Sequence, residues 1–193
     1  MATWEKQNSM LFIDTSETPS APDWARLRKS TVFDLAFNPE VETLDFIDQQ
    51  FPSDVLKYYK PSMEQETQLE EGDELFDYMF ALMNALPTGS SAVRPVLFVF
   101  PKAAEGADGA FVAWKVDCTV SFANYDAVEK KLSFSLAFAG DVSHGSATFA
   151  AGAPTFTYYR ERLIRRLAGL RWSGAVHEAI PPVGNVVYWD KAA

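Results

Sequence analysis

Seven acidic side chains and no basic one lie between Glu64 and Asp77, and here the chain concentrates the groups that could do acid–base chemistry. A pair of carboxylates held at a fixed separation can hydrolyse a glycosidic bond. Pairs of acids arise by chance in an acidic chain, however, and nothing in the sequence singles out two of these seven. We therefore interpret the stretch as a charged surface rather than as an active site.

Other residue types that catalyse reactions are scarce. The two histidines, His144 and His177, lie beside glycine-rich or turn-like sequence, and neither has a partner at a metal-binding spacing. No glycine-rich phosphate loop or nucleophile elbow is present. The single cysteine, Cys118, lies in a strand-like run, where we expect a small buried residue. The sequence predicts no enzyme activity, no cofactor and no metal site.

The elements that must position the acids are a strand and a helix on either side of Gly72. If residues 62–71 form a strand, Glu64, Glu66 and Glu70 share one face, because successive side chains of a strand point to opposite sides. The other face then carries Met63, Gln65, Thr67 and Leu69. The pattern predicts a row of carboxylates along one face of the strand.

Residues 73–86 carry the signals of a helix. Asp73 is suited to cap its N-terminus, and Pro87 and Gly89 follow its end. Apolar residues recur at spacings of three and four, namely Leu75, Met79, Leu82, Met83 and Leu86. That stripe needs an apolar surface to cover it, and one face of a sheet is the expected partner.

The rest of the chain favours β structure. A length of 193 residues with 48% hydrophobic content suits one domain. Alternating runs predict strands near 10–16, 24–37 and 41–51, and a meander of strands between 94 and 150. In the second run the side chains expected to point inward are Trp24, Arg26, Phe33, Leu35 and Phe37. The predicted fold class is mainly antiparallel β structure with one flanking α-helix.

Two segments are expected to extend from this domain. A proline near each end indicates a long projecting loop at about 48–62. Residues 154–193 are interpreted as a C-terminal arm with many arginines. For this arm, pairing with acids of another subunit, binding to nucleic acid and a solvated helix face all stay open. Candidate contacts between subunits are Tyr58, Tyr59, Lys60, Arg160, Arg162, Arg165 and Arg166.

The net charge of −9 is unevenly distributed. Residues 1–80 hold 17 acids and 6 bases, whereas residues 81–193 hold 9 acids and 11 bases. The excess of acid argues against tight binding of nucleic acid, and the imbalance favours attraction between different copies of the chain. No apolar run reaches the ~18 residues of a membrane helix, and the N-terminus lacks the order of a signal peptide. We therefore expect a soluble, cytoplasmic protein without membrane insertion.

Several motifs follow one another over residues 10–100. An early strand leads to the segment "WAR", then to the turn "NPEVE", the loop end "YKPS" and the helix start "GDELFDY". In this order they resemble the major tail tube proteins of long, non-contractile-tailed bacteriophages. The later strands are compatible with that family, and residues 154–193 do not map onto it.

The resemblance implies a β-sandwich or β-barrel domain over residues 1–153, with a flanking helix, that assembles as stacked rings, usually of six subunits. Its implied location is the virion tail, assembled in the host cytoplasm. The implied partners are further copies of the chain, a tape-measure protein in the lumen, tail terminator and distal tail proteins, and double-stranded DNA that passes without specific binding. In such a tube Glu64, Glu66 and Glu70 are candidates to face the lumen, where rings of acids would repel phosphate.

Two other functions are compatible with these patterns. One is the inner tube of a contractile tail or of a type VI secretion apparatus, which must also bind a sheath. The other is a soluble β-barrel that binds a small ligand, which predicts a stable monomer. A tail tube subunit instead predicts polymers that depend on concentration.

Overall fold

The computed structural model describes residues 8–16, 21–48, 50–68, 70–104 and 109–159. One α-helix, α1 (Glu74–Ala85), and a short 3₁₀ turn, η2 (Gly89–Ala92), accompany the strands of this part of the chain. The strands are β1 (Met10–Asp14), β2 (Trp24–Arg26), β3 (Asp34–Ala36), β4 (Pro39–Leu44), β5 (Ser53–Tyr59), β6 (Ser62–Gln68), β7 (Val93–Ala103), β8 (Phe111–Asp126), β9 (Lys131–Phe138), β10 (Ser143–Ala150) and β11 (Ala153–Tyr158). The predicted fold class, antiparallel β structure with one helix, is confirmed.

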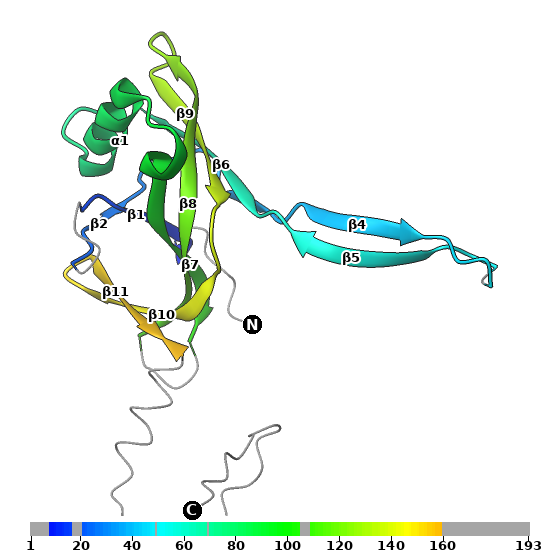
Figure 1. The fold of residues 1–193 in the computed structure, drawn as a ribbon. Coiled ribbons are helices and arrows are strands. Elements are labelled where there is room, and N and C mark those ends of the chain that lie inside the picture. Colours follow the sequence, from blue (N-terminus) through cyan, green and yellow to red (C-terminus); the bar gives the residue numbers. More distant parts are fainter. Residues whose placement is uncertain (1–7, 17–20, 49, 69, 105–108, 160–193) are drawn as a thin grey trace, which may run out of the picture.

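Antiparallel pairing joins most strands into one sheet, in the order β2-β1-β7-β8-β9-β6-β3 (Figure 1). The long strand β8 has two partners on one edge. Its residues 111–115 pair with β10, and its residues 118–126 pair with β9. Strand β11 extends the β10 branch. The described strands therefore form an open sheet that divides into two branches at β8.

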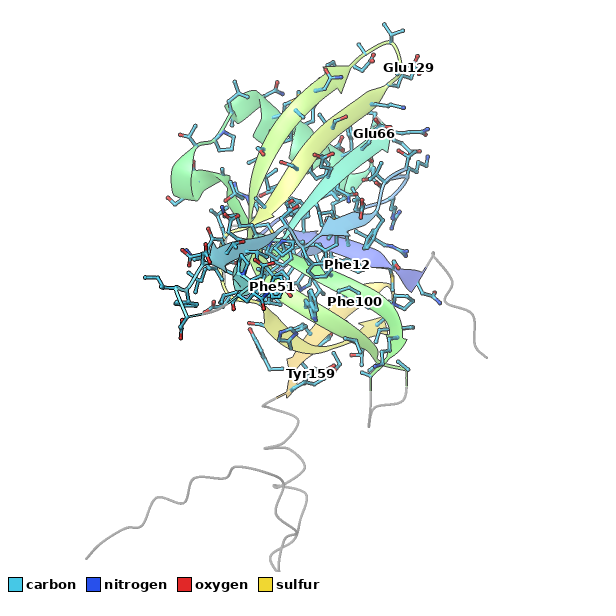
Figure 2. All side chains as sticks on the ribbon, turned by 90° about the vertical axis from the view of Figure 1, so that its right-hand side faces the viewer. Phe12, Phe51, Glu66, Phe100, Glu129 and Tyr159 are labelled. Atoms are coloured by element: carbon cyan, nitrogen blue, oxygen red, sulfur yellow. The ribbon has the colours of Figure 1, made fainter. Side chains whose placement is uncertain are left out.

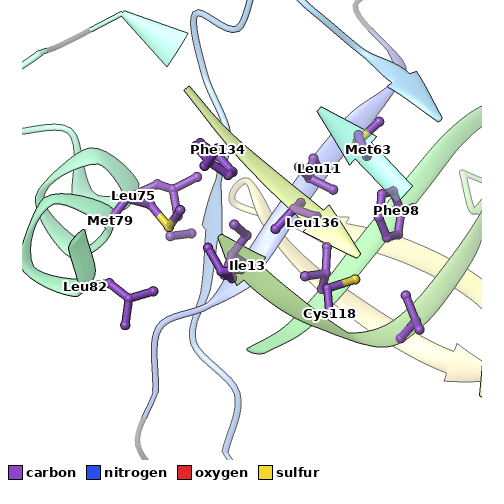
Figure 3. Packing of buried hydrophobic residues seen from close by; sticks show 14 of the residues in the cluster. Leu11, Ile13, Met63, Leu75, Met79, Leu82, Phe98, Cys118, Phe134 and Leu136 are labelled. Carbon is purple, nitrogen blue, oxygen red and sulfur yellow. The ribbon is translucent and has the colours of Figure 1, made fainter. Parts of the chain in front are cut away.

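One face of the sheet packs against α1. Leu75, Met79 and Leu82 of the helix are buried against apolar side chains of β1, β6, β8 and β9 (Figure 3). Burial alternates along β9, where Leu132 and Phe134 point into this core. Full burial of each such side chain contributes about 1.5–3 kcal/mol, so this contact stabilises both the helix and the sheet.

The opposite face is covered over only part of its area. The β10–β11 branch packs over β1 and β7, where Phe12, Leu97 and Ala147 are buried in a second cluster. The rings of Phe12 and Phe149 lie 5.9 Å apart in it. Over β3, β6, β9 and the end of β8, the described residues provide no second layer on this side. The sheet is thus two-layered at one end and open at the other.

The ends of α1 agree with the predicted helix signals. The Asp73 carboxylate accepts a hydrogen bond from the backbone N–H of Phe76 at 3.1 Å, which confirms the N-cap. Leu86 ends the helix in a left-handed conformation, with φ of 44°. Its side chain is exposed, so the prediction that Leu86 belongs to the buried stripe is wrong.

The predicted loop at about 48–62 is largely a strand, and this part of the prediction is wrong. Strand β5 pairs with β4 in a two-stranded hairpin that extends from the body on the side away from α1 (Figure 1). Its base is closed by the backbone N–H of Lys60, which donates to the carbonyl of Asn38 at 3.2 Å. Since β3 and β6 also pair with each other, the hairpin is an insertion between two neighbouring strands.

Two further expectations need correction. In residues 24–37 the buried side chain is Ala25, whereas Arg26, Phe33 and Phe37 are exposed. A break in pairing between β2 and β3 shifts the register that a single period-two strand would have. The start of the arm at residue 154 is also wrong, because β11 continues the sheet through Tyr158.

Candidate functional site

The open half of the sheet presents a surface that we call the polar face. Its side chains come from four neighbouring strands and are exposed or half-buried, namely Asp34, Glu64, Glu66, Ser121, Ser133 and Ser135. Strand register sets Asp34 beside Glu64 and Glu64 beside Ser135. Ser135 in turn shares a hydrogen bond of 2.7 Å with Ser121. Figure 2 views this side of the sheet, with Glu66 labelled.

The alternation predicted for β6 is confirmed. Glu64 is exposed and Glu66 half-buried on the polar face, while Met63, Gln65 and Thr67 are buried on the other side. The remaining candidate, Glu70, lies beyond the last residue of β6, where it pairs with Lys29. Two of the three candidate acids therefore share one strand surface.

Glu64 and Glu66 differ in the groups that surround their carboxylates. Glu66 pairs with Lys131 of β9 at 2.9 Å and accepts a hydrogen bond from the Thr31 hydroxyl at 3.0 Å. These two contacts, Lys131 first, lower the pKa of the Glu66 carboxyl. The same contact with Glu66 raises the pKa of Lys131. Glu64 has no ion-pair partner among the described residues, so it carries its negative charge uncompensated beside Asp34.

The β4–β5 hairpin exposes apolar and charged side chains on both of its sides. On one side Val41 faces Leu56 across the strands, and both are about half exposed. On the other side Lys57 pairs with Glu42 at 2.9 Å. A register shift next to Glu40 is a β-bulge, which increases the twist of the strand pair. Each side of the hairpin therefore combines apolar and acidic residues, because Asp54 lies on the side of Val41 and Val55 lies opposite Glu42.

The predicted contact residues divide into two groups. Tyr58, Tyr59 and Lys60 lie at the base of the hairpin and are exposed. The Lys60 ammonium lies 5.2 Å from the centre of the Tyr58 ring, and Tyr59 makes an edge contact with Phe37. The other group, Arg160, Arg162, Arg165 and Arg166, lies outside the described residues.

A cleft of about 1200 Å³ opens where the hairpin leaves the sheet. Aromatic rings line it, among them Tyr59, Trp114 and Phe138. The exposed His144 makes an edge contact with Trp114, with 5.3 Å between the ring centres. Asp141 also lines the cleft. This cleft is wide and mixed in polarity, and it lies under the chain's own hairpin.

Cys118 is buried in the core, as the sequence predicts. Burial and the neighbouring Asp117 raise the pKa of its thiol to about 12, so it stays neutral at physiological pH. Within the residues that the structure describes, no three or more His, Cys, Asp or Glu side chains are grouped to hold a metal ion. The helices of that same part are too short to cross a membrane.

Several residues of these surfaces were not identified from sequence. Asp34 joins the polar face only because β3 pairs with β6, and no local pattern indicates that pairing. The hydroxyls of Ser133 and Ser135 show period two in the sequence, which signals an exposed face but not its acidic neighbours. The apolar end of the hairpin is visible in sequence as the run from Phe46 to Phe51, where it resembles an ordinary core strand.

Comparison with known proteins places the fold. No protein-family model matches the sequence, and no curated protein matches it. Among solved structures, the chain is similar to one described as the tail of an empty GTA particle with C6 symmetry, at 12% identity and a TM-score of 0.50. That similarity covers 74% of this chain and 98% of the other.

Two chains of the anti-feeding prophage are also similar. One is in its tube-terminating cap (11% identity, 76% of this chain, 93% of the other, TM-score 0.44) and one in its baseplate (12%, 75%, 97% and 0.45). The chain has a β-rich fold of the tail-tube type, with a mostly antiparallel sheet and a single helix.

Proposed function

We propose that this protein is a structural subunit of a phage-like tail that polymerises as stacked rings into a tube. The observation that carries this proposal is the similarity to the GTA tail chain, 98% of which is covered. The similarity extends over nearly the whole of that tail chain and supports the proposal. By analogy with the C6 symmetry of that tail, we propose six subunits per ring. The protein acts in the virion tail after assembly in the host cytoplasm.

Edge strands supply a means of closing the ring. Among the described residues, β2 pairs only with β1, β3 only with β6, and β11 only with β10. Unpaired strand edges can be completed by strands of another chain. In the tube the ring closes through such contacts, and the sheet of the described residues forms its wall.

The polar face lines the bore in this proposal. Its serine hydroxyls are small and neutral, and Glu64 with Asp34 supplies negative charge at the same level of the sheet. Six copies would turn each acid into a ring of acids. Such rings repel phosphates over a Debye length of about 8 Å, so double-stranded DNA would pass without specific binding. A tape-measure protein would occupy the bore first, and tail terminator and distal tail proteins would bind the ends.

The hairpin is proposed to make the contact between rings. It exposes large apolar side chains on two strands that have no second layer, and isolated two-stranded hairpins are marginally stable in water. Contact with another copy removes this surface from water. The long reach of the hairpin, visible in Figure 1, suits a neighbour along the tube axis. A non-contractile tail tube, which needs no sheath, is the form we propose.

The experiment that tests the proposal is negative-stain electron microscopy of the purified full-length protein over a range of concentrations and salt. Hollow rods or rings with a regular axial repeat are the expected result. Irregular aggregates would not satisfy the prediction, because they lack the repeat. Monomers at every concentration and salt would overturn the proposal and favour a ligand-binding domain.

A further inference from the structure

The end of the β4–β5 hairpin combines negative charge with exposed apolar surface. Between Thr43 and Leu56 the sequence holds three acids, Asp45, Asp48 and Asp54, and no base. Large apolar side chains are exposed in the same stretch, and we call three of them, Phe46, Ile47 and Phe51, the hairpin tip. Ile47 is fully exposed, at 108% of its reference area. Side chains of this kind on a projecting element mark a contact surface.

A groove of opposite charge lies on the body. It follows the segment that links β2 to β3 and has a volume of about 700 Å³. Leu11, Leu27 and Phe33 give it an apolar floor and side. Its charged lining residues are all basic, namely Arg26, Arg28 and Lys29. The same three bases also line an adjoining pocket, whose other wall carries Glu70, Glu71, Asp73 and Glu74. We call this the basic groove.

The charges of the basic groove are partly engaged within the chain. Lys29 pairs with Glu70 at 2.5 Å at the end of the groove nearest α1. Arg28 is exposed and makes no ion pair with the described residues. Its guanidinium is therefore the base of the groove best placed to meet a carboxylate from outside.

We propose that the hairpin tip of one copy docks into the basic groove of a second copy. Phe46 and Ile47 would contact Leu27 and Phe33, and Asp45 or Asp48 would pair with Arg28. Opposite charges on the two surfaces speed the encounter and fix its register. The inference rests on the proposed function, since both require self-association, and it adds the acceptor site that the polymer uses.

The geometry makes this contact heterologous. The tip and the basic groove are different surfaces of the chain, so each copy offers one to a neighbour and receives the other from the next copy. Contacts of this kind do not close on themselves between two subunits and instead propagate along an axis. A polymer with a repeat along its length follows.

The cleft at the base of the hairpin is a poorer acceptor. Asp141 lies in its lining together with Lys60 and His144, so the acids of an incoming tip would meet a like charge there. The chain's own hairpin also overhangs it, since Tyr59 and Pro39 form part of its wall. Among the described residues, no acid and no residue of the hairpin is part of the lining of the basic groove itself.

Cysteine cross-linking tests the contact directly. One full-length variant carries Ile47→Cys in the tip, and another carries Ser9→Cys in the wall of the groove. The native Cys118 stays silent because its thiol is buried and neutral. Mixed and oxidised, the two variants should give a disulfide-linked dimer on a non-reducing gel. The matched control pairs Ile47→Cys with Val128→Cys, another fully exposed turn residue, and should give none.

Reversal of charge tests the same contact without cysteines. Asp48→Lys and Arg28→Glu should each raise the concentration needed for polymers by about tenfold or more, because a like-charge contact replaces an attractive one. The two substitutions together in one chain should bring this concentration most of the way back to that of the wild type. The control is Lys102→Glu, which changes the charge by the same amount as Arg28→Glu. Lys102 is exposed and lies outside the groove, so this variant should polymerise as the wild type does.

The outcomes separate the two proposals. Polymers that form normally from Arg28→Glu, with no cross-link between tip and groove, would overturn the acceptor site while the tail subunit proposal stands. Wild-type protein that forms no polymer under any condition would overturn both.

Discussion

Glu64 and Glu66 lie two residues apart on one strand yet meet different surroundings. Glu66 is held by Lys131 and Thr31, while Glu64 sits beside the carboxylate of Asp34. Period two places both acids on one face, and that much follows from sequence. Their partners come from strands that are distant in the chain, so the difference between the two acids depends on tertiary pairing and was not predictable.

A first prediction concerns the pH response of Glu66. Lys131→Met should raise the pKa of Glu66 toward its ordinary value, and Thr31→Val should raise it by less, because the Lys131 contact is the larger cause. The folded-state pKa is lowered, so the stabilisation from this contact is present above the unfolded-state pKa of Glu and is lost as pH falls through the lowered value. Carboxyl-carbon NMR titration measures both shifts. An unchanged Glu66 titration in Lys131→Met would contradict the assignment.

A second prediction concerns Gly145 in β10. A Cβ atom at this position would overlap the carbonyl oxygen of Thr157 and lie 2.6 Å from the ring of Phe156, both on β11. Gly145→Ala should therefore lower the free energy of unfolding by about 1–3 kcal/mol, as overpacking does. Thermal unfolding measures the loss.

The control is Gly140→Ala, where the nearest heavy atom to an added Cβ is 3.9 Å away. Equal stability of the two variants would show that β10 and β11 do not pack as closely as described.

Among the elements, α1 was predicted correctly from sequence patterns and the hairpin was not. The helix was predicted with its N-cap because the signals are local, and Asp73 caps its own following turn. The second strand of the hairpin was predicted as part of a loop because Pro52 and Pro61 bound it, whereas residues 41–51 were predicted as a strand. The hairpin's apolar side chains are exposed, and in the proposed function another subunit supplies the surface that covers them.

A third prediction separates the hairpin from the fold. Replacing Pro39–Tyr59 by two glycines should change the free energy of unfolding by no more than about 1 kcal/mol, because β3 and β6 still pair across the cut. The same variant should remain monomeric in analytical ultracentrifugation at concentrations where the wild type polymerises. Val128→Ser, in the exposed turn between β8 and β9, should polymerise as the wild type does. If the variant without the hairpin formed tubes, the hairpin could not be the contact between rings.

At the scale of the whole molecule, the sheet divides its two faces between different environments. α1 covers one face, and the polar face lies on the other (Figures 1 and 2). The sequence predicted a sheet with one helix, and the order of the strands was not predictable because pairings such as β1 with β7 and β6 with β9 join strands that are distant in the chain. The ring and the bore are properties of several copies, and they belong to the proposed function.

A fourth prediction tests the polar face as the lining of the bore. Ser135→Cys should react with a bulky maleimide in the monomer and much more slowly in the assembled tube, whereas Val128→Cys serves as a comparison site on a turn away from the face. A small maleimide should reach Ser135→Cys in both states, since the bore admits small molecules. Labelling rates followed by mass spectrometry give the ratio. Equal rates for the bulky reagent before and after assembly would place Ser135 outside the bore.

Pairing of β3 with β6 has a consequence for how such a chain can diversify. The hairpin leaves and re-enters the sheet at one place, where the Asn38 side chain donates hydrogen bonds to the Lys60 carbonyl and to the Ser62 hydroxyl. Changes in its length or residues therefore leave the register of the sheet intact. If the hairpin makes the contact between rings, as we propose, two chains with the same body and different hairpins would form separate polymers. The hairpin alone would then determine which chains polymerise together, while the structure of the sheet stays the same.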